Sequence, residues 1–193
     1  MFSTTQPSLA VVALGYGGHG IFVNNTVIGT NPTQTSACTS YDELTNGAPG
    51  VIVENNAIEG CGILVGGTGN FPFATFDYNA YANWSGYHCF FTNFNGTAID
   101  VLSYSSWQAM SGLDTHSAAD TLRLGTGSTP EAPSHLLRTG GHHAPETGSP
   151  LVSSGANLAG LCTGSLTALC QKPDGTPRLT VGALEIGSCP KLA

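Results

Sequence analysis

The stretch that decides the fold reads GIFVNNTVI over residues 20–28. It aligns without gaps with GVIVENNAI over residues 50–58, at an offset of 30 residues. A third copy, FDYNAY over residues 76–81, follows the second at an offset of 23 residues. Repeats of this length indicate supersecondary units that stack on one another. An offset in the low twenties fits one coil of a parallel β-helix, which is three short strands with their turns.

The Asn pair in the first two copies has a physical role in stacked coils, and the third copy has one Asn, Asn79. One Asn side chain stacks on its counterpart in the next coil, and the amides hydrogen-bond along the ladder while Val and Ile fill the core. The longer first offset predicts that residues 30–49 project from one coil as a polar loop. An antiparallel sandwich is the alternative, because Asn-rich turns are also common between hairpin strands. The periodicity favours coils and leaves hairpins open.

The composition is typical of an all-β protein that is rich in turns. Charged residues make up 9% of the chain, about a third of the usual share of roughly 25%. Hydrophobic residues at 40%, with eight Phe, argue against disorder. With 26 Gly and 11 Pro there is little room for long helices, and the surface must consist largely of Ser, Thr, Asn and Gly.

The charge pattern excludes some partners. The formal net charge is −7, and the five Lys and Arg residues are scattered without any run of two. Nucleic acid binding needs clustered basic residues, so the sequence argues against it. A direct grip on polyanionic sugars is also disfavoured unless a cation bridges the two acidic surfaces. No stretch reaches the ~18 apolar residues of a membrane span.

Six cysteines in a chain of this composition predict disulfides and an oxidising compartment. Cys162 and Cys170 close the shortest loop, so we expect them to form one bridge. The other pairings stay open, and so do buried free thiols. No C-x-x-C pair is present, which disfavours a metal site on cysteines.

We expect one domain over residues 1–193. Residues 1–19 are predicted to be an N-terminal cap or edge segment, residues 20–117 the coils, and residues 118–193 a loop-rich tail with closing strands. Three shorter segments are predicted to be strands, at Ile99–Leu102, Ser149–Val152 and Leu179–Glu185. A helical turn is predicted at Ser105–Met110. The apolar run at Leu9–Leu14 lacks the features of a signal peptide. A missing export signal in a chain that looks exported suggests a piece of a longer protein.

Four motifs carry a resemblance to a known family. Residues 77–81 (DYNAY) are similar to the D-Y-N-x-Y strand found late in bacterial right-handed β-helix repeat proteins. Residues 107–117 resemble their W-Q-x-x-x-G-x-D-x-x-S segment, and residues 148–155 (GSPLVSSG) resemble G-S-P-A-I-D-A-G. Residues 174–178 and 182–185 are similar to the closing D-x-x-G-x-P-R … G-A-x-E.

The resemblance implies an all-β fold, a right-handed parallel β-helix of about three to four coils with a loop-rich C-terminal tail. It points to the C-terminal portion of a protein of the pectate-lyase-like superfamily, secreted or anchored at the cell surface. The implied function is extracellular and glycan-associated: binding or cleaving polysaccharide, as a glycoside hydrolase or lyase. The alternative is a non-catalytic structural or adhesive module of a larger cell-surface protein. Ser153 and Ser154, where the family has an acidic residue, mark a divergent member.

Carboxylates are the first catalytic candidates, because glycan hydrolysis needs two of them about 5 to 10 Å apart. Asp77 and Asp100 are separated by one coil length and would stack about 5 Å apart in neighbouring coils. Asp114 and His116 would face the same side of an extended segment and act as a base with an orienting partner. The competing interpretation is that these residues tie turns together through hydrogen bonds to the backbone.

Substrate contacts are predicted among the aromatic residues between Phe71 and Phe94, because aromatic faces bury apolar sugar surface well. Most of these rings are expected to fill the core. Trp84 and Tyr87 are the best exposed candidates, and Arg138 is the basic candidate.

No metal site is predicted. His142 and His143 are adjacent, so they would point in opposite directions in a strand, and they are expected to lie in a loop. Calcium is the one cofactor that the resemblance allows, since β-helix lyases use it with Asp clusters and an Arg base. With few coils, the one near residues 10–25 would present an unpaired strand edge. We expect the N-terminal segment to cap this edge, or the edge to pack on another chain.

Overall fold

The structure is a computed structural model that describes residues 2–4, 12–15, 20–29, 37–42, 51–59, 63–69, 73–82, 90–94, 97–101, 103–119, 153–171 and 176–177. Most of these residues lie in short strands that form three sheets, here called A, B and C. Sheet A contains β1 (Phe2–Thr4), β4 (Thr26–Gly29), β7 (Ala57–Glu59), β10 (Ala80–Ala82) and β13 (Ala118–Ala119). Sheet B contains β2 (Val12–Gly15), β5 (Ala37–Asp42), β8 (Ile63–Gly69), β11 (Phe90–Phe94) and β12 (Thr97–Val101). Sheet C contains β3 (Ile21–Val23), β6 (Val51–Glu54) and β9 (Phe73–Asp77).

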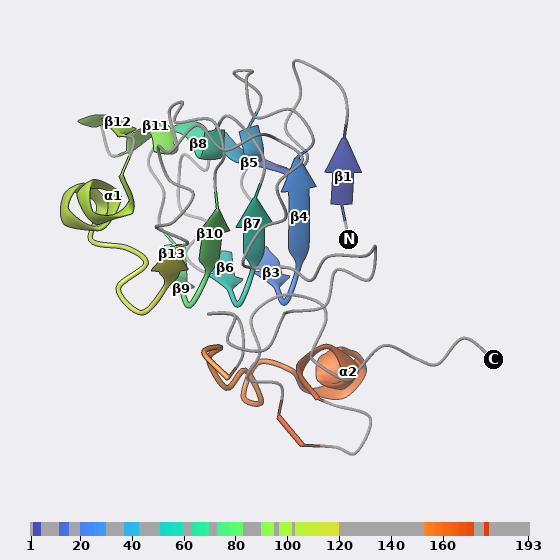
Figure 1. Ribbon diagram of the computed structural model, residues 1–193. Coiled ribbons are helices and arrows are strands. Elements are labelled where there is room, and N and C mark those ends of the chain that lie inside the picture. The colour runs from blue at the N-terminus through green and yellow to red at the C-terminus, as the bar shows by residue number, and fades with distance from the viewer. Residues whose placement is uncertain are drawn as a thin grey trace, which may run out of the picture.

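The strands enter the three sheets in a fixed rotation. From β1 to β11 each strand lies in the sheet after that of its predecessor, so every third strand along the chain pairs with the one before it. All these pairings are parallel. Figure 1 shows the strands of sheet A side by side, sheet B across their upper ends and sheet C behind their lower ends. The described residues are therefore mostly β-structure in parallel sheets, as the all-β prediction requires, and the hairpin alternative is wrong for these segments.

The pairing register corrects the sequence alignment by one residue. Asn25 lies opposite Asn56, 31 residues away, where the alignment assumed an offset of 30. The second offset, 23 residues from Asn56 to Asn79, is confirmed. A shift of one residue would move every side chain of a strand to the opposite face. The Asn pairs therefore determine the register, and the match between the glycines at positions 20 and 50 does not.

A second correction concerns residues 30–49, which were expected to form a loop. They contain β5, whose residues pair with β2 on one side and β8 on the other. Residues 30–49 therefore include a central strand of sheet B, the counterpart of β8 in the next repeat.

The core is formed by alternate side chains of each strand, because successive side chains point to opposite faces of a sheet. In sheet C, Phe22, Val53 and Phe76 lie opposite one another and are all buried. On the other face the exposure varies: Ile21 is 49% exposed, whereas Val23 and Glu54 are buried. In sheet A, Val27, Ile58 and Tyr81 form a column that is fully buried. Each such side chain contributes about 1.5–3 kcal/mol by burial.

The end of the stack after β10 is closed by a different arrangement. Strand β12 turns back antiparallel to β11 and is followed by α1 (Tyr104–Ser111), which begins after the N-cap Ser103 and ends at Gly112 with φ 70°. Trp107 is its buried residue and packs edge-on against Phe76, with ring centroids 6.2 Å apart. Figure 1 shows α1 at the end of the stack opposite β1. The predictions of a strand near Ile99–Leu102 and a helical turn at Ser105–Met110 are confirmed.

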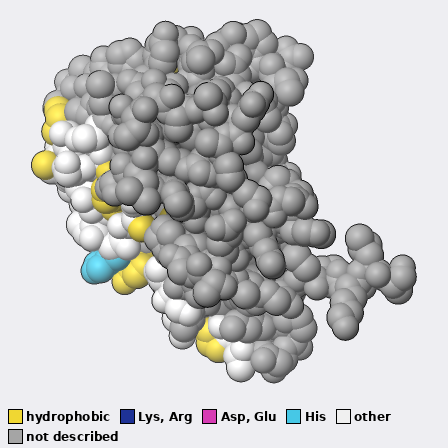
Figure 2. Space-filling model, viewed as in Figure 1, with side chains coloured by type: hydrophobic (Ala, Val, Ile, Leu, Met, Phe, Trp, Pro, Cys, Tyr) yellow, Lys and Arg dark blue, Asp and Glu magenta, His cyan; other side chains and the backbone are white. Residues whose placement is uncertain are grey.

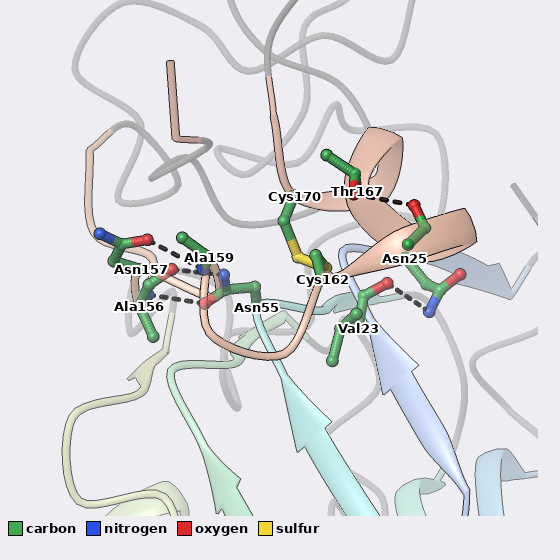
Figure 3. Close-up of a disulfide and its surroundings, with 10 residues drawn as sticks. Val23, Asn25, Asn55, Ala156, Asn157, Ala159, Cys162, Thr167 and Cys170 are labelled. Carbon is green, nitrogen blue, oxygen red and sulfur yellow. Dashed lines mark hydrogen bonds between the residues drawn. A yellow bond between two sulfur atoms is a disulfide. The ribbon is translucent and has the colours of Figure 1, made fainter. Parts of the chain in front are cut away.

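The described part of the tail packs on the outside of sheet C. Leu158, Cys162 and Cys170 form a buried cluster with Val23, and the predicted disulfide between Cys162 and Cys170 is present with a Cα–Cα distance of 5.8 Å. Asn55 fastens the tail, because its side chain accepts from the backbone N–H of Ala156 (2.7 Å) and donates to the same residue's carbonyl (2.9 Å) (Figure 3).

This segment also contains a 3₁₀ turn, η1 (Gly164–Leu166), and the one-turn helix α2 (Thr167–Cys170). The strands predicted at Ser149–Val152 and Leu179–Glu185 lie outside the described residues. The N-terminal segment contributes β1 and β2, each of which is the terminal strand of its sheet.

Candidate functional site

A ladder of asparagines runs along the corner between sheets C and A. The Asn25 backbone N–H and Nδ2 both donate to Oδ1 of Asn56, at 3.0 and 3.2 Å. The backbone N–H and Nδ2 of Asn56 donate in the same way to Oδ1 of Asn79, at 3.1 and 3.0 Å. Asn56 and Asn79 are buried. The stacking predicted for the Asn pairs is therefore confirmed.

The corners share a second feature. Asn24, Asn55 and Tyr78, which precede the ladder residues, have φ values of 56°, 58° and 55°. This left-handed conformation is tolerated by Asn better than by most residues, and a Tyr there is unusual. The backbone N–H of Tyr78 donates to Oδ1 of Asp77 at 2.8 Å, which holds the turn in this conformation.

The ladder ends at Asp114, which is fully buried. Its carboxylate accepts from Nδ2 of Asn79 (3.1 Å), Oγ of Ser117 (2.5 Å), the hydroxyl of Tyr81 (2.8 Å) and Nε1 of Trp107 (2.7 Å). Ser117 takes the place of a further Asn, because its Oγ accepts the backbone N–H of Asn79 at 2.7 Å. The carboxylate is therefore surrounded by donors from the last ladder residue, from β10 and from α1.

The backbone of Asp114 is held as firmly as its side chain. Its N–H donates to the carbonyl of Phe76 at 2.9 Å, and its carbonyl accepts from the Tyr104 hydroxyl and Nε2 of Gln108, both at 2.6 Å. Burial raises the pKa of Asp114 to about 6, although the hydrogen bonds from Ser117 and its other donors counteract part of this rise. Burial, and then the nearby Asp114 carboxylate, raise the pKa of Tyr104.

A second carboxylate, Asp77, lies nearer the surface and pairs with His116. Oδ2 of Asp77 lies 2.7 Å from Nδ1 of His116 and also accepts from the hydroxyl of Thr115 at 3.1 Å. Oδ1 accepts the backbone N–H groups of Tyr78 and His116. The Asp77 side chain is 18% exposed and that of His116 is 62% exposed. The imidazole stacks on the Tyr78 ring with centroids 4.9 Å apart.

The pKa values of Asp77 and of the neighbouring Glu54 are shifted in opposite directions. Burial acts to raise the pKa of Asp77, but the hydrogen bonds from His116, Tyr78 and Thr115 outweigh it, and the pKa lies below its ordinary value. Glu54 lies opposite Asp77 in the ladder of sheet C. Burial raises the pKa of Glu54; the Thr75 hydroxyl lowers it and the Asp77 charge raises it further. Asp77 is therefore the ionised partner of His116 at neutral pH.

The predicted catalytic residues do not come together as expected. Asp77 and Asp100 are not stacked, because Asp100 lies in β12 of sheet B opposite Phe91, and Asp77 lies in sheet C. His116 pairs with Asp77 and not with Asp114, because the left-handed φ of 57° at Asp114 breaks the extended run that would place the two on one face. The competing interpretation, that the Asp residues tie turns to backbone groups, is confirmed for Asp77.

Three predicted substrate contacts, Trp84, Tyr87 and Arg138, lie outside the described residues, as do His142 and His143. In the view of Figure 2 the coloured surface shows hydrophobic, uncharged polar and histidine side chains and no acidic or basic ones. The described residues contain no group of three or more His, Cys, Asp or Glu that could hold a metal ion. In the same part of the chain, no helix has the length and apolar character needed to span a membrane.

Several residues of the site were not singled out from the sequence as site residues. Trp107 and Ser117 entered the prediction only as parts of motifs, and Tyr81 also as one of the aromatic residues expected mostly in the core. All three converge on the Asp114 carboxylate. The two motifs at residues 77–81 and 107–117 carried the signal. They contain a Tyr, a Trp and a Ser, and the side chains of all three can donate a hydrogen bond to one buried Asp. Glu54 was not singled out either, although the sequence offset of 23 residues already places it opposite Asp77.

Comparison with known proteins gave no relatives: no protein-family model, curated protein or solved structure matches the chain.

Proposed function

We propose that this chain forms the closing coils of a right-handed parallel β-helix and serves as a non-catalytic structural or adhesive module. The rotation of strands through three sheets supports the β-helix, since each full rotation returns the chain to a parallel neighbour. Parallel crossovers are right-handed in about 98% of cases. The corner positions of Asn25, Asn56, Asn79 and Ser117 correspond to about three to four coils.

The observation that carries the non-catalytic assignment is the burial of Asp114. A glycosidase needs two carboxylates that reach the same substrate bond. Asp114 is fully buried and its two oxygens already accept four donors. It cannot contact a substrate, so its role is to close the ladder and hold α1 over the end of the core.

An extracellular location is part of the proposal. The disulfide between Cys162 and Cys170 supports it, and so does the disulfide-bonded state of Cys38, because disulfides persist mainly in oxidising compartments. The low charge and the many Ser, Thr and Asn residues also suit a surface exposed to the medium.

The second candidate is a glycan-binding or glycan-cleaving site at Asp77 and His116, of the superfamily to which the sequence shows a resemblance. One observation favours it. Asp77 holds Nδ1 of an exposed imidazole at 2.7 Å, so the outward Nε2 of the neutral ring carries the lone pair. Such a pair can take a proton from a sugar hydroxyl or ring carbon.

One experiment separates the two candidates. The wild type, Asp114→Asn and His116→Gln are incubated with neutral and acidic polysaccharides, with and without calcium, and thermal unfolding is recorded in parallel. The structural module predicts no product from any of the three, with a lowered Tm for Asp114→Asn. A product made by the wild type and lost in His116→Gln at unchanged Tm would overturn the non-catalytic assignment and support the second candidate.

A further inference from the structure

One hydroxyl group lies between the two carboxylates at the closing end of the stack. Oγ of Ser117 lies 2.5 Å from Oδ1 of Asp114 and 3.5 Å from Oδ1 of Asp77. The same oxygen accepts the backbone N–H of Asn79 at 2.7 Å. A serine hydroxyl has one hydrogen to donate, so Ser117 serves one of the two carboxylates at a time. The two distances place this hydrogen on Asp114 in the structure.

Asp114 is the carboxylate whose protonation changes near neutral pH. It is fully buried, and the titratable groups that face it are Tyr81 from β10 and Tyr104 from α1. Burial raises the pKa of Asp114 to about 6, whereas hydrogen bonds hold the pKa of Asp77 below its ordinary value. As the pH falls through about 6, Asp114 therefore takes up a proton while Asp77 stays ionised.

A proton on Asp114 needs an acceptor. Trp107 and Asn79 face the carboxylate with N–H groups, which can only donate. Ser117 faces it with a hydroxyl, whose oxygen has two lone pairs. That oxygen can accept the new O–H of Asp114 and keep the N–H of Asn79. Its own hydrogen must then turn away from Asp114, and Oδ1 of Asp77 is an acceptor within reach.

We propose that Ser117 is a hydroxyl switch that links the buried Asp114 to the surface pair Asp77 and His116. While Asp114 is ionised, the Ser117 hydrogen lies on Asp114. When Asp114 takes up a proton from solvent, its O–H donates to Oγ of Ser117, and the Ser117 hydrogen turns to Oδ1 of Asp77. The inference goes beyond the proposed function, and it holds whether or not the surface pair contacts a glycan.

The switch changes how firmly the surface imidazole is held. Oδ1 of Asp77 already accepts the backbone N–H groups of Tyr78 and His116. A further donor draws negative charge away from the carboxylate, and this weakens the bond from Oδ2 to Nδ1 of His116. The other titratable group that faces Asp77 is Glu54 from β6. The described residues contain no Lys or Arg, so in this part of the chain no such cation competes with the hydroxyl for Asp77.

NMR of the full chain with carboxyl-labelled aspartate tests the switch. The carboxyl carbons of Asp77 and Asp114 are followed from about pH 4 to about pH 8, on both sides of the Asp114 titration. We expect the Asp77 signal to shift at the same pH as the Asp114 signal, and Asp114→Asn to lose that shift. Shifts that Glu54 and His116 cause at Asp77 persist in Asp114→Asn, which identifies them.

Two variants of Ser117 separate the hydroxyl from a direct effect of charge. Ser117→Ala has no hydroxyl and should lose most of the coupled shift at Asp77, whereas Ser117→Thr keeps the hydroxyl and should keep the shift. The electric field of Asp114 reaches Asp77 in both variants alike. An equal shift in Ser117→Ala and the wild type would therefore overturn the switch.

The wild type and Asp114→Asn suffice if Ser117→Ala does not fold. An Asp77 signal that is the same in these two proteins would overturn the switch. So would a coupled shift at the ring of Tyr81 or Tyr104 without one at Asp77, because the proton would then have turned another hydroxyl. An Asp114 signal that does not titrate over this range would overturn it as well.

Discussion

Replacement of Asn56 by Ala should be among the most damaging single changes in the ladder. The Asn56 side chain accepts two hydrogen bonds from Asn25, through the backbone N–H and Nδ2. It donates two more, to the carbonyl of Phe22 at 2.9 Å and to Oδ1 of Asn79 at 3.0 Å. Alanine removes all four in a position that is fully buried.

The cost follows from the groups left behind. The backbone N–H of Asn25 and the carbonyl of Phe22 lose these partners, and a buried polar group without a partner costs about 1–3 kcal/mol. Oδ1 of Asn79 keeps the backbone N–H of residue 56 and loses less. We therefore expect a loss of about 3–5 kcal/mol in the free energy of unfolding. For a chain of this size that lowers the Tm by roughly 10 °C.

Chemical denaturation of matched variants measures this loss. Asn25→Ala removes two side-chain hydrogen bonds from a half-buried position, and should cost about 1–2 kcal/mol. Asn157→Ala removes one local hydrogen bond at an exposed site, and should cost less than about 1 kcal/mol. The expected order is Asn56 first, then Asn25, then Asn157. A cost at Asn56 no larger than the cost at Asn157 would refute the ladder.

The other predictions concern the closing end and the tail. Burial raises the folded pKa of Asp114 to about 6, above its ordinary 3.8, so the folded state binds this proton more tightly than the unfolded state does. The free energy of unfolding of the wild type should therefore fall as pH rises from about 4 to about 6. Urea unfolding at both pH values should show that Asp114→Asn lacks this decrease, and an identical pH dependence of the two proteins would contradict the prediction. Trp107→Phe removes one donor to the same carboxylate and should lower stability by about 1–3 kcal/mol, whereas Met110→Leu, at an exposed position of the same helix, should have little effect. Joint replacement of Cys162 and Cys170 by Ser should lower the free energy of unfolding by about 2–3 kcal/mol, because the loop is short. Hydrogen exchange should become faster in residues 156–171 and stay unchanged in residues 51–59. Uniformly faster exchange would show that the tail does not unfold as a separate unit.

Most of the β-structure could be predicted because the repeat encodes it directly. Val and Ile lie on both sides of an Asn pair. Only a stack of similar corners both buries the Val and Ile side chains and lets the Asn side chains hydrogen-bond to one another. The exact register could not be read from nine residues, because matches at the ends of the copies compete with the Asn pair. Only hydrogen bonding between Asn25 and Asn56 decides between offsets of 30 and 31 residues.

The sequence predicted which residues form the site and did not predict how their side chains are arranged. Asp77, Asp114 and His116 do lie together, and Asp77 is joined to His116. The sequence could not show that Asp114 has φ 57° and faces inward, because that conformation depends on the donors from β10 and α1. The strand β5 was missed for a similar reason: it lies within an unusually long and polar repeat, and its pairing partners β2 and β8 are distant in sequence.

The parallel stacking of corners is tested most directly by NOEs among three alanines. Ala57 pairs with Ala80, and Ala80 pairs with Ala118, although each pair is separated by more than twenty residues. Selective labelling of alanine should give strong interstrand NOEs from Ala57 to Ala80 and from Ala80 to Ala118. NOEs that pair β3 with β4 across residues 24 and 25 as an antiparallel hairpin, without the alanine contacts, would contradict the β-helix.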